Sequence, residues 1–154
     1  MEGDLNIPVV ESSQPIDVAK YENKQYLIAK VERTTRESHY FTDPITGENK
    51  YRKDEVVEVP AVLIETESLD MISDGKGGTR TLTVKATLNL QERVNKETGK
   101  KDVVISKNPK AKLWQLMRRL NVQTLEELKG KKVTVVTQPS SDEDDDRLWL
   151  RILI

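Results

Sequence analysis

The chain has 154 residues and a formal net charge of only −1, because its 25 Lys and Arg residues nearly balance its 26 Asp and Glu residues. This length suits one domain with a modest hydrophobic core, and long stretches of periodic apolar residues argue against wholesale disorder. The absence of cysteine excludes disulfides, thiolate metal sites and cysteine nucleophiles, and the single histidine excludes multi-histidine metal sites, so we expect neither a cofactor nor a metal.

The first 20 residues mix prolines, serines and acidic side chains with few apolar ones, and we expect a flexible N-terminal arm over residues 1–20. The acidic opening lacks the basic region of a secretory signal, and no apolar run in the chain reaches the ~18–20 residues of a membrane span. The sequence therefore predicts a cytoplasmic protein with no membrane partner, made of this arm and a single domain over residues 21–154.

Three strands are predicted in the first part of this domain. Residues 26–33 alternate with the period of two that is typical of a half-buried strand. Turn-forming residues over 43–49 lie between flanks rich in Tyr, Phe, Thr and Arg, which predicts a long hairpin-like loop. Residues 55–66 form a β-branched run for the second strand, in which Pro60 indicates a bulge or an edge because proline has no N–H to donate. The clearest alternation, over residues 82–90, predicts the third strand.

The pattern changes after the third strand. Hairpin-turn residues over 95–100 predict that residues 103–105 return as a short extra strand. Asn108 is suited to cap a helix whose first position is Pro109. An apolar stripe at i, i+3, i+4 and i+7 then predicts an amphipathic helix of about three turns, with Leu113, Leu116, Met117 and Leu120 on its buried face.

A short capped turn leads from this helix to the last two strands. Thr124 and Glu127 have the spacing of a capping box, in which the hydroxyl and the carboxylate each satisfy a free backbone amide, and Gly130 is suited to end the turn. Alternating residues over 132–137 and 148–154 predict two strands that close the chain.

The near-neutral charge conceals segregation along the chain. Residues 1–71 carry 8 basic and 15 acidic residues, whereas residues 72–132 carry 15 basic and 6 acidic residues, and the remainder has a small acidic excess. A basic middle segment could attract a polyanion if its charges share one surface after folding, although Lys and Arg also serve simply to keep turns and helix faces soluble.

Three strands, a helix and two strands follow one another in the order of the OB-fold, a five-stranded Greek-key barrel with its helix between strands three and four. Two passages add to this order, Pro-Lys-Ala-Lys-Leu at 109–113 and Leu-Glu-Glu-Leu-Lys-Gly-Lys-Lys-Val-Thr-Val at 125–135. Over residues 108–136 the chain resembles OB-fold single-stranded DNA-binding proteins of the replication protein A-like and phage types. The resemblance implies a mainly β OB-fold barrel, here with an extra hairpin after strand three, and non-catalytic binding of single-stranded DNA, or of RNA, with little sequence preference.

Single-strand binding requires cations that follow the phosphates and exposed aromatic rings on which bases stack. OB-folds bind oligonucleotides across strands two and three, between the loops that join strands one to two and four to five. The candidate binding residues are Arg33, Arg36, Tyr40, Phe41, Tyr51, Arg52, Lys53, Arg80, Lys85, Trp149 and Arg151. The alternatives are that the loop rings pack across a two-stranded ribbon, that the cations are ordinary solvated residues, and that Trp149 covers the end of a barrel.

Five consecutive acidic residues over 142–146 oppose this interpretation, because they lie in the predicted loop between the last two strands and would repel phosphates. They could instead compete for the protein's own basic groove, recruit a basic protein partner or serve solubility alone. The alternative function is accordingly a protein-interaction or structural subunit of a larger assembly, with the acidic run or the N-terminal arm as its docking element.

An enzyme is not expected. The lone His39 lies in a predicted loop, where a histidine is usually only a surface residue. The glycines over 75–78 precede a strand and not a helix, so they indicate a turn and not a phosphate-binding loop. We therefore expect no small-molecule substrate.

Overall fold

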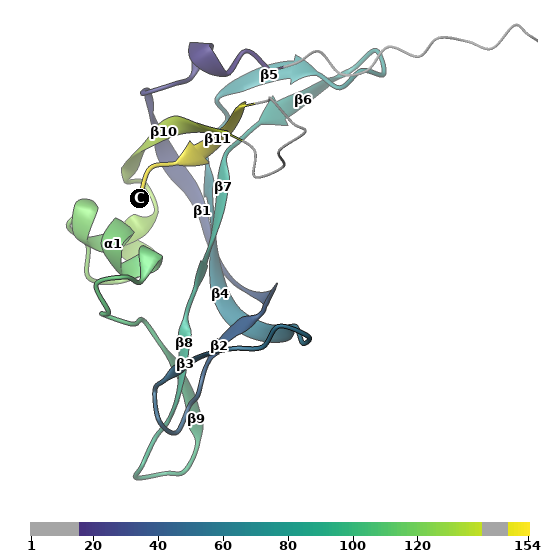
Figure 1. Ribbon diagram of the computed structural model, residues 1–154. Helices are drawn as coiled ribbons and strands as arrows, with labels where there is room; N and C mark the ends of the chain where they lie inside the picture. Colours follow the sequence, from purple (N-terminus) through teal and green to yellow (C-terminus); the bar gives the residue numbers. More distant parts are fainter. Residues whose placement is uncertain (1–15, 140–147) are drawn as a thin grey trace, which may run out of the picture.

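The computed structural model describes residues 16–139 and 148–154, and within these ranges the chain is mainly β with a single α-helix (Figure 1). The expectation of a mainly β chain is thus confirmed. Residues 1–15, which are most of the predicted arm, lie outside the described residues, and so does the acidic run over 142–146. No helix in the described ranges is long and apolar enough to cross a membrane.

The elements of the described residues follow one another along the chain in this order, with η marking short 3-10 helices: η1 (Val18–Lys20), β1 (Gln25–Ser38), β2 (Tyr40–Thr42), β3 (Asn49–Tyr51), β4 (Val57–Thr66), β5 (Asp70–Ser73), β6 (Thr79–Leu82), β7 (Lys85–Asn89), β8 (Gln91–Val94), β9 (Lys101–Val104), α1 (Lys112–Arg119), η2 (Glu126–Leu128), β10 (Lys132–Pro139) and β11 (Leu148–Ile152).

Five of the strands form one antiparallel sheet in the order β11-β10-β1-β4-β7. The central strand, β1, changes its partner along its length, since residues 25–27 pair with β10 and residues 28–38 pair with β4. The register shifts between Ile28 and Lys30, and a bulge of this kind bends a strand. The two edge strands, β7 and β11, contact each other without a hydrogen-bonded ladder, so the sheet is strongly curved.

The hydrophobic core lies between this sheet and α1. Leu113, Leu116 and Met117 of α1 are at most 2% exposed, and they pack in one cluster with buried residues of β1, β4, β7, β10 and β11. Leu120, just after the helix, packs against the same cluster. The predicted apolar stripe is therefore confirmed.

The predicted start of the helix is wrong. The helix begins at Lys112 and has eight residues, little more than two turns, with Ala111 at the N-cap position. Asn108 lies before the helix, where its Oδ1 accepts a hydrogen bond from the N–H of Lys110 at 2.9 Å. An asparagine side chain that bonds the backbone two residues later favours a turn, and here it competes successfully with the capping role.

The predicted third strand, 82–90, covers the last residue of β6 and the whole of β7, and it ends just before β8. The alternation itself is right, because Leu82, Val84, Leu88 and Leu90 are buried and the residues between them are more exposed. The strand is interrupted because its segments have different partners: β6 pairs with β5 and β7 with β4, and β8, which follows at once, pairs with β9. A period of two reports which side is buried and carries no information about the neighbouring strand.

Pro60 causes no bulge in β4, which stays in register with β1 through the pair Thr35–Pro60. The carbonyl of Pro60 accepts a hydrogen bond from the N–H of Leu90 at 2.9 Å, just beyond the last β4–β7 pair, Ala61–Asn89. The N–H and C=O groups of a residue in an antiparallel strand face the same neighbouring strand. The carbonyl of Pro60 faces β7, so the N–H that proline lacks would also face β7, at the point where the β4–β7 ladder ends.

Within the described residues, three two-stranded hairpins extend from the sheet: β2–β3, β5–β6 and β8–β9. The turns predicted over 43–49 and 95–100 connect the first and the last of these, as expected. Figure 1 shows β2–β3 and β8–β9 at one end of the sheet and β5–β6 at the other. The N–H of Val94 donates to the carbonyl of Pro44 at 3.0 Å, which joins the two hairpins that share an end.

The capped turn after α1 forms, but only one of the two backbone hydrogen bonds of the predicted capping box is present. The N–H of Glu127 donates to Thr124 Oγ1 at 3.3 Å, as the capping box predicts, but the Glu127 carboxylate accepts from the Thr124 hydroxyl at 3.2 Å and not from a backbone amide. Gly130 follows with φ +86°, the left-handed conformation expected of a residue that ends such a turn.

Candidate functional site

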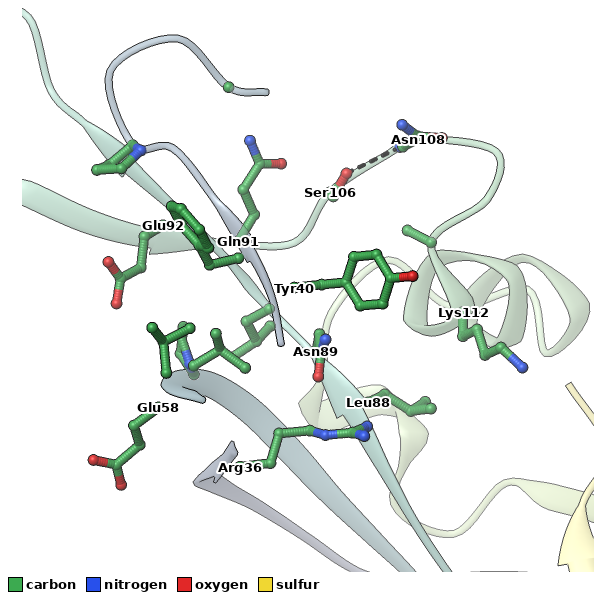
Figure 2. Close-up of a pocket in the computed structure, with 18 of the residues that line it drawn as sticks. Arg36, Tyr40, Glu58, Leu88, Asn89, Gln91, Glu92, Ser106, Asn108 and Lys112 are labelled. Carbon is green, nitrogen blue, oxygen red and sulfur yellow. Dashed lines mark hydrogen bonds between the residues drawn. The ribbon is translucent and has the colours of Figure 1, made fainter. Parts of the chain in front are cut away.

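An open groove of about 640 Å³ lies at the end of the sheet where β2–β3 and β8–β9 extend (Figure 2). The hairpin β2–β3 forms one wall, and the segment that leads from β9 into α1 forms the other. The ends of β4 and β7 and the start of β8 form the floor. Four of the predicted binding residues line this groove: Arg36, Tyr40, Phe41 and Arg52.

The aromatic residues of the hairpin wall contact one another. Tyr40 and Tyr51 are directly opposite in the β2–β3 register, with ring centroids 4.8 Å apart, and the Arg52 guanidinium lies 4.5 Å from the centre of the Phe41 ring. Arg52 also forms an ion pair with Glu55 at 2.8 Å. The rings therefore pack across a ribbon, in agreement with the alternative interpretation. Tyr40 is nevertheless 62% exposed and lines the groove, so it is available to a ligand as well.

Polar contacts of Asp43 stabilise the turn of this hairpin. Asp43 Oδ1 accepts the N–H groups of Ile45 and Thr46, and its Oδ2 accepts Lys50 Nζ at 3.0 Å. The bond from the Ile45 backbone, followed by those from Lys50 and Thr46, holds the pKa of Asp43 below its usual value. These contacts thus stabilise the turn of the hairpin that carries Tyr40.

The lone histidine is part of this scaffold. The Nδ1 atom of His39 lies 3.0 Å from two backbone carbonyls, those of Arg52 and Glu55, so Nδ1 carries a proton and donates to them. The backbone carbonyl of His39 accepts a hydrogen bond from the N–H of Arg52 at 2.9 Å. His39 therefore closes the base of the β2–β3 hairpin.

The floor of the groove is built across three strands. Arg36 of β1 donates from Nη1 to the carbonyl of Thr87 in β7 at 3.1 Å, and its side chain must cross β4 on the outer face of the sheet to do so. This bond fixes a cation at the floor beside Leu88 and Asn89, as Figure 2 shows.

The charges that line the groove are predominantly positive. The cations that line it are Arg36, Arg52, Lys101, Lys110 and Lys112, and the carboxylates are those of Glu58 and Glu92. A concave surface with an excess of one charge sign concentrates its field and attracts ligands of the opposite sign. The groove is therefore suited to an anionic ligand.

Arg33 does not share the face of its neighbour Arg36. It is paired with Val62, which is fully buried, whereas Arg36 is paired with Val59 three residues away along β1, and strand neighbours an odd number apart point to opposite faces. Arg33 lines a second hollow, of about 210 Å³, together with Glu126 and Lys129 near η2.

Other predicted residues lie away from the groove. Arg80 belongs to the β5–β6 hairpin, at the opposite end of the sheet, and Trp149 and Arg151 belong to the edge strand β11. Lys85 lies on β7 with its Nζ 3.6 Å from Glu65, whose pKa is lowered first by the bond from the Thr83 hydroxyl and further by the charge of Lys85, against the effect of burial. Tyr51, at the end of β3, and Lys53, just after it, are exposed but do not line the groove.

The groove also contains Gln91, Ser106 and Asn108, which the sequence does not single out as binding residues, and Asn89, which is outside the candidate set but on the predicted polar face of the third strand. Asn89 follows the alternation of the predicted third strand, which indicates that it faces away from the core. No pattern within the sequence indicates that the other three come to the same place, because they depend on how β8–β9 returns toward α1.

Comparison with protein-family models, with curated proteins and with solved structures found no match to this chain. Among the described residues, no group of three or more His, Asp or Glu side chains is arranged to hold a metal ion. The groove, with its exposed ring and its excess of cations, is therefore the feature from which a function can be inferred.

Proposed function

We propose that the chain is a non-catalytic OB-fold domain that binds single-stranded nucleic acid in the groove, with DNA as the expected ligand ahead of RNA. The strand order supports the fold. Numbered along the chain, the five strands of the main sheet are β1, β4, β7, β10 and β11, so their order in space is 5-4-1-2-3, with α1 between the third and the fourth. Contact between the edge strands β7 and β11 would complete a partly open barrel.

One observation carries the proposed function. The groove lies over the second and third strands of this order, β4 and β7, beside the hairpin that connects the first strand to the second, where OB-folds bind oligonucleotides. It combines an exposed ring, that of Tyr40, with an excess of cations. These are the two components that non-specific single-strand binding requires, stacking for the bases and positive charge for the phosphates.

The experiment is a titration of fluorescent single-stranded and duplex oligonucleotides at increasing salt. We expect preference for the single strand and an affinity that falls steeply as salt rises, because bound cations release counterions from the phosphates. The joint change Tyr40→Ala and Arg52→Ala removes one ring and one cation from the groove and should weaken binding strongly.

The chain provides a matched control. The joint change Trp149→Ala and Arg151→Ala removes the same types of side chain from β11, outside the groove, and should leave the affinity almost unchanged. A loss of binding in the control alone would move the site to β11. An absence of binding even at low salt would overturn the proposed function and favour a protein-interaction subunit.

A further inference from the structure

The cations around the groove differ in whether they already have partners. Arg52, beside the hairpin β2–β3, forms its ion pair with Glu55, and Arg36, on the floor, donates to the carbonyl of Thr87. The other wall, between β9 and α1, contributes three cations: Lys101, Lys110 and Lys112. None of these lysines has a carboxylate within ion-pair distance in the part of the chain that the structure describes. The positive charge of this wall is therefore available to an anionic ligand.

The same excess of positive charge continues beyond the groove. From residue 103 to residue 125 the sequence contains five Lys and Arg residues and no Asp or Glu. Two of the five, Lys107 and Arg118, are exposed and do not line the groove. A third, Arg119, donates from Nη2 to the carbonyl of Ile154 at 3.5 Å. Cations without neighbouring acidic residues in the chain thus lead from the groove wall onto α1.

Lys107 and Arg118 both lie beside Trp114. The Nζ atom of Lys107 is 5.4 Å from the centre of the Trp114 ring, and Arg118 follows Trp114 by four residues in α1, which makes the two side chains neighbours on the helix surface. Figure 2 shows Asn108 and Lys112 where the chain enters α1 at the edge of the groove. Arg118 lies six residues after Lys112, about 9 Å further along the helix axis.

We infer that the phosphates of the bound strand follow the wall between β9 and α1 out of the groove and onto the exposed side of α1, where Lys107 and Arg118 bind them beside Trp114. With the phosphates on this wall, the bases face the opposite wall, where Tyr40 presents its exposed ring. This inference rests on the proposed function. It adds the path of the phosphates and a second contact region, the α1 extension, formed by Lys107, Trp114 and Arg118.

The test compares two oligothymidylates, of about 4 and about 12 nucleotides, because OB-folds bind roughly 4–16 nucleotides. We expect the short one to occupy the groove and the long one to reach the α1 extension as well. Each phosphate contact to a single strand contributes about 0.7 to the slope of log affinity against log salt. The joint change Lys107→Gln and Arg118→Gln should therefore lower this slope by about 1.4 for the long oligonucleotide and leave it unchanged for the short one.

The chain offers a matched control for this variant. The joint change Lys76→Gln and Arg80→Gln also removes one exposed lysine and one exposed arginine, but from the β5–β6 hairpin at the opposite end of the sheet. Neither oligonucleotide should change its salt dependence in this control.

Trp114 provides a local measurement that does not depend on charge. The chain has two tryptophans, so Trp149→Phe leaves Trp114 as the only one. The long oligonucleotide should change the fluorescence of Trp114, because the strand passes the ring and competes for Lys107. The short oligonucleotide should leave it unchanged.

The results separate the inference from the proposed function. If the long oligonucleotide has the same salt dependence with the parent and with the Lys107 and Arg118 variant, or leaves Trp114 fluorescence unchanged, the α1 extension is wrong and the proposed function still stands. If the variant affects both oligonucleotides equally, the two cations act at the groove and the extension is likewise wrong. If neither oligonucleotide binds the parent at low salt, the inference and the proposed function both fail.

Discussion

The hydroxyl of Tyr21 donates a 2.7 Å hydrogen bond to the carboxylate of Asp70. The same carboxylate accepts Lys20 Nζ at 2.9 Å and the N–H of Met71 at 2.8 Å. The bond from Lys20, followed by those from Tyr21 and Met71, lowers the pKa of Asp70 from 3.8 to about 2. These contacts fasten η1, which the sequence predicts as part of a flexible arm, to the hairpin β5–β6.

The Asp70 cluster makes stability depend on pH. Because the carboxylate is favoured in the folded chain, its contribution is complete above an unfolded pKa of 3.8 and is lost as the pH falls toward 2. Asp70→Asn should lower the free energy of unfolding at pH 7, and the difference from the parent should narrow as the pH approaches 2. Urea unfolding at both pH values measures this. Asp54→Asn, at an exposed site without such a cluster, should show neither effect.

Shortening a buried side chain of α1 should cause a large loss of stability. Leu116 is 0% exposed and lies in the main cluster, so Leu116→Ala should lower the free energy of unfolding by about 2–5 kcal/mol. Leu27→Ala makes the same chemical change at a site that is 38% exposed and should cost clearly less. Denaturant unfolding of the two variants gives the comparison, and equal losses would contradict the packing described for α1.

The two tyrosines of the hairpin should differ in binding. Stacking of one base is worth about 1–3 kcal/mol, so Tyr40→Ala should weaken single-strand binding roughly tenfold, and Tyr40→Phe should preserve it. Tyr51→Ala should have a smaller effect, because Tyr51 touches Tyr40 but does not line the groove. Anisotropy titrations check both. If Tyr51→Ala were as costly as Tyr40→Ala, the rings would act only by holding the ribbon together.

Lys110 and Lys112, on the groove wall formed by the segment between β9 and α1, should contribute to binding through their charge alone. The joint change Lys110→Glu and Lys112→Glu should weaken binding at low salt and make the affinity less sensitive to added salt, because fewer phosphate contacts release counterions. The change Arg80→Glu alters charge on β6, away from the groove, and should leave the salt dependence nearly unchanged. An unaltered salt dependence in the double variant would place the phosphate path elsewhere.

Sequence alone is sufficient for the parts of the fold that depend on local periodicity. The buried stripe of α1, the alternation from Leu82 to Leu90 and the turn at 43–49 are all predictable from residue spacing or from turn chemistry. The predicted helix start is wrong because Asn108 favours a turn and a cap by the same kind of hydrogen bond, and sequence does not decide between them.

The candidate site is harder to predict because it depends on contacts between distant segments. Arg36 reaches the groove only by crossing β4 to Thr87, and Lys110 and Lys112 reach it only after β8–β9 has turned back toward α1. The separation of Arg33 from Arg36, by contrast, is predictable from the sequence, since three residues along a strand reverse the face.

Because β1 pairs with β4 along most of its length and with β10 at its start, we expect its two parts to become paired at different stages of folding. Its longer part pairs with β4, which follows closely in the chain, but Gln25 pairs with Thr134, near the other end of the chain. During synthesis, the β1–β4–β7 portion can form as soon as those strands leave the ribosome, whereas residues 25–27 must wait for β10. Until β10 is present, the backbone donors and acceptors of residues 25–27 that pair with it have no strand partner, and we expect mispairing during folding to be most frequent there.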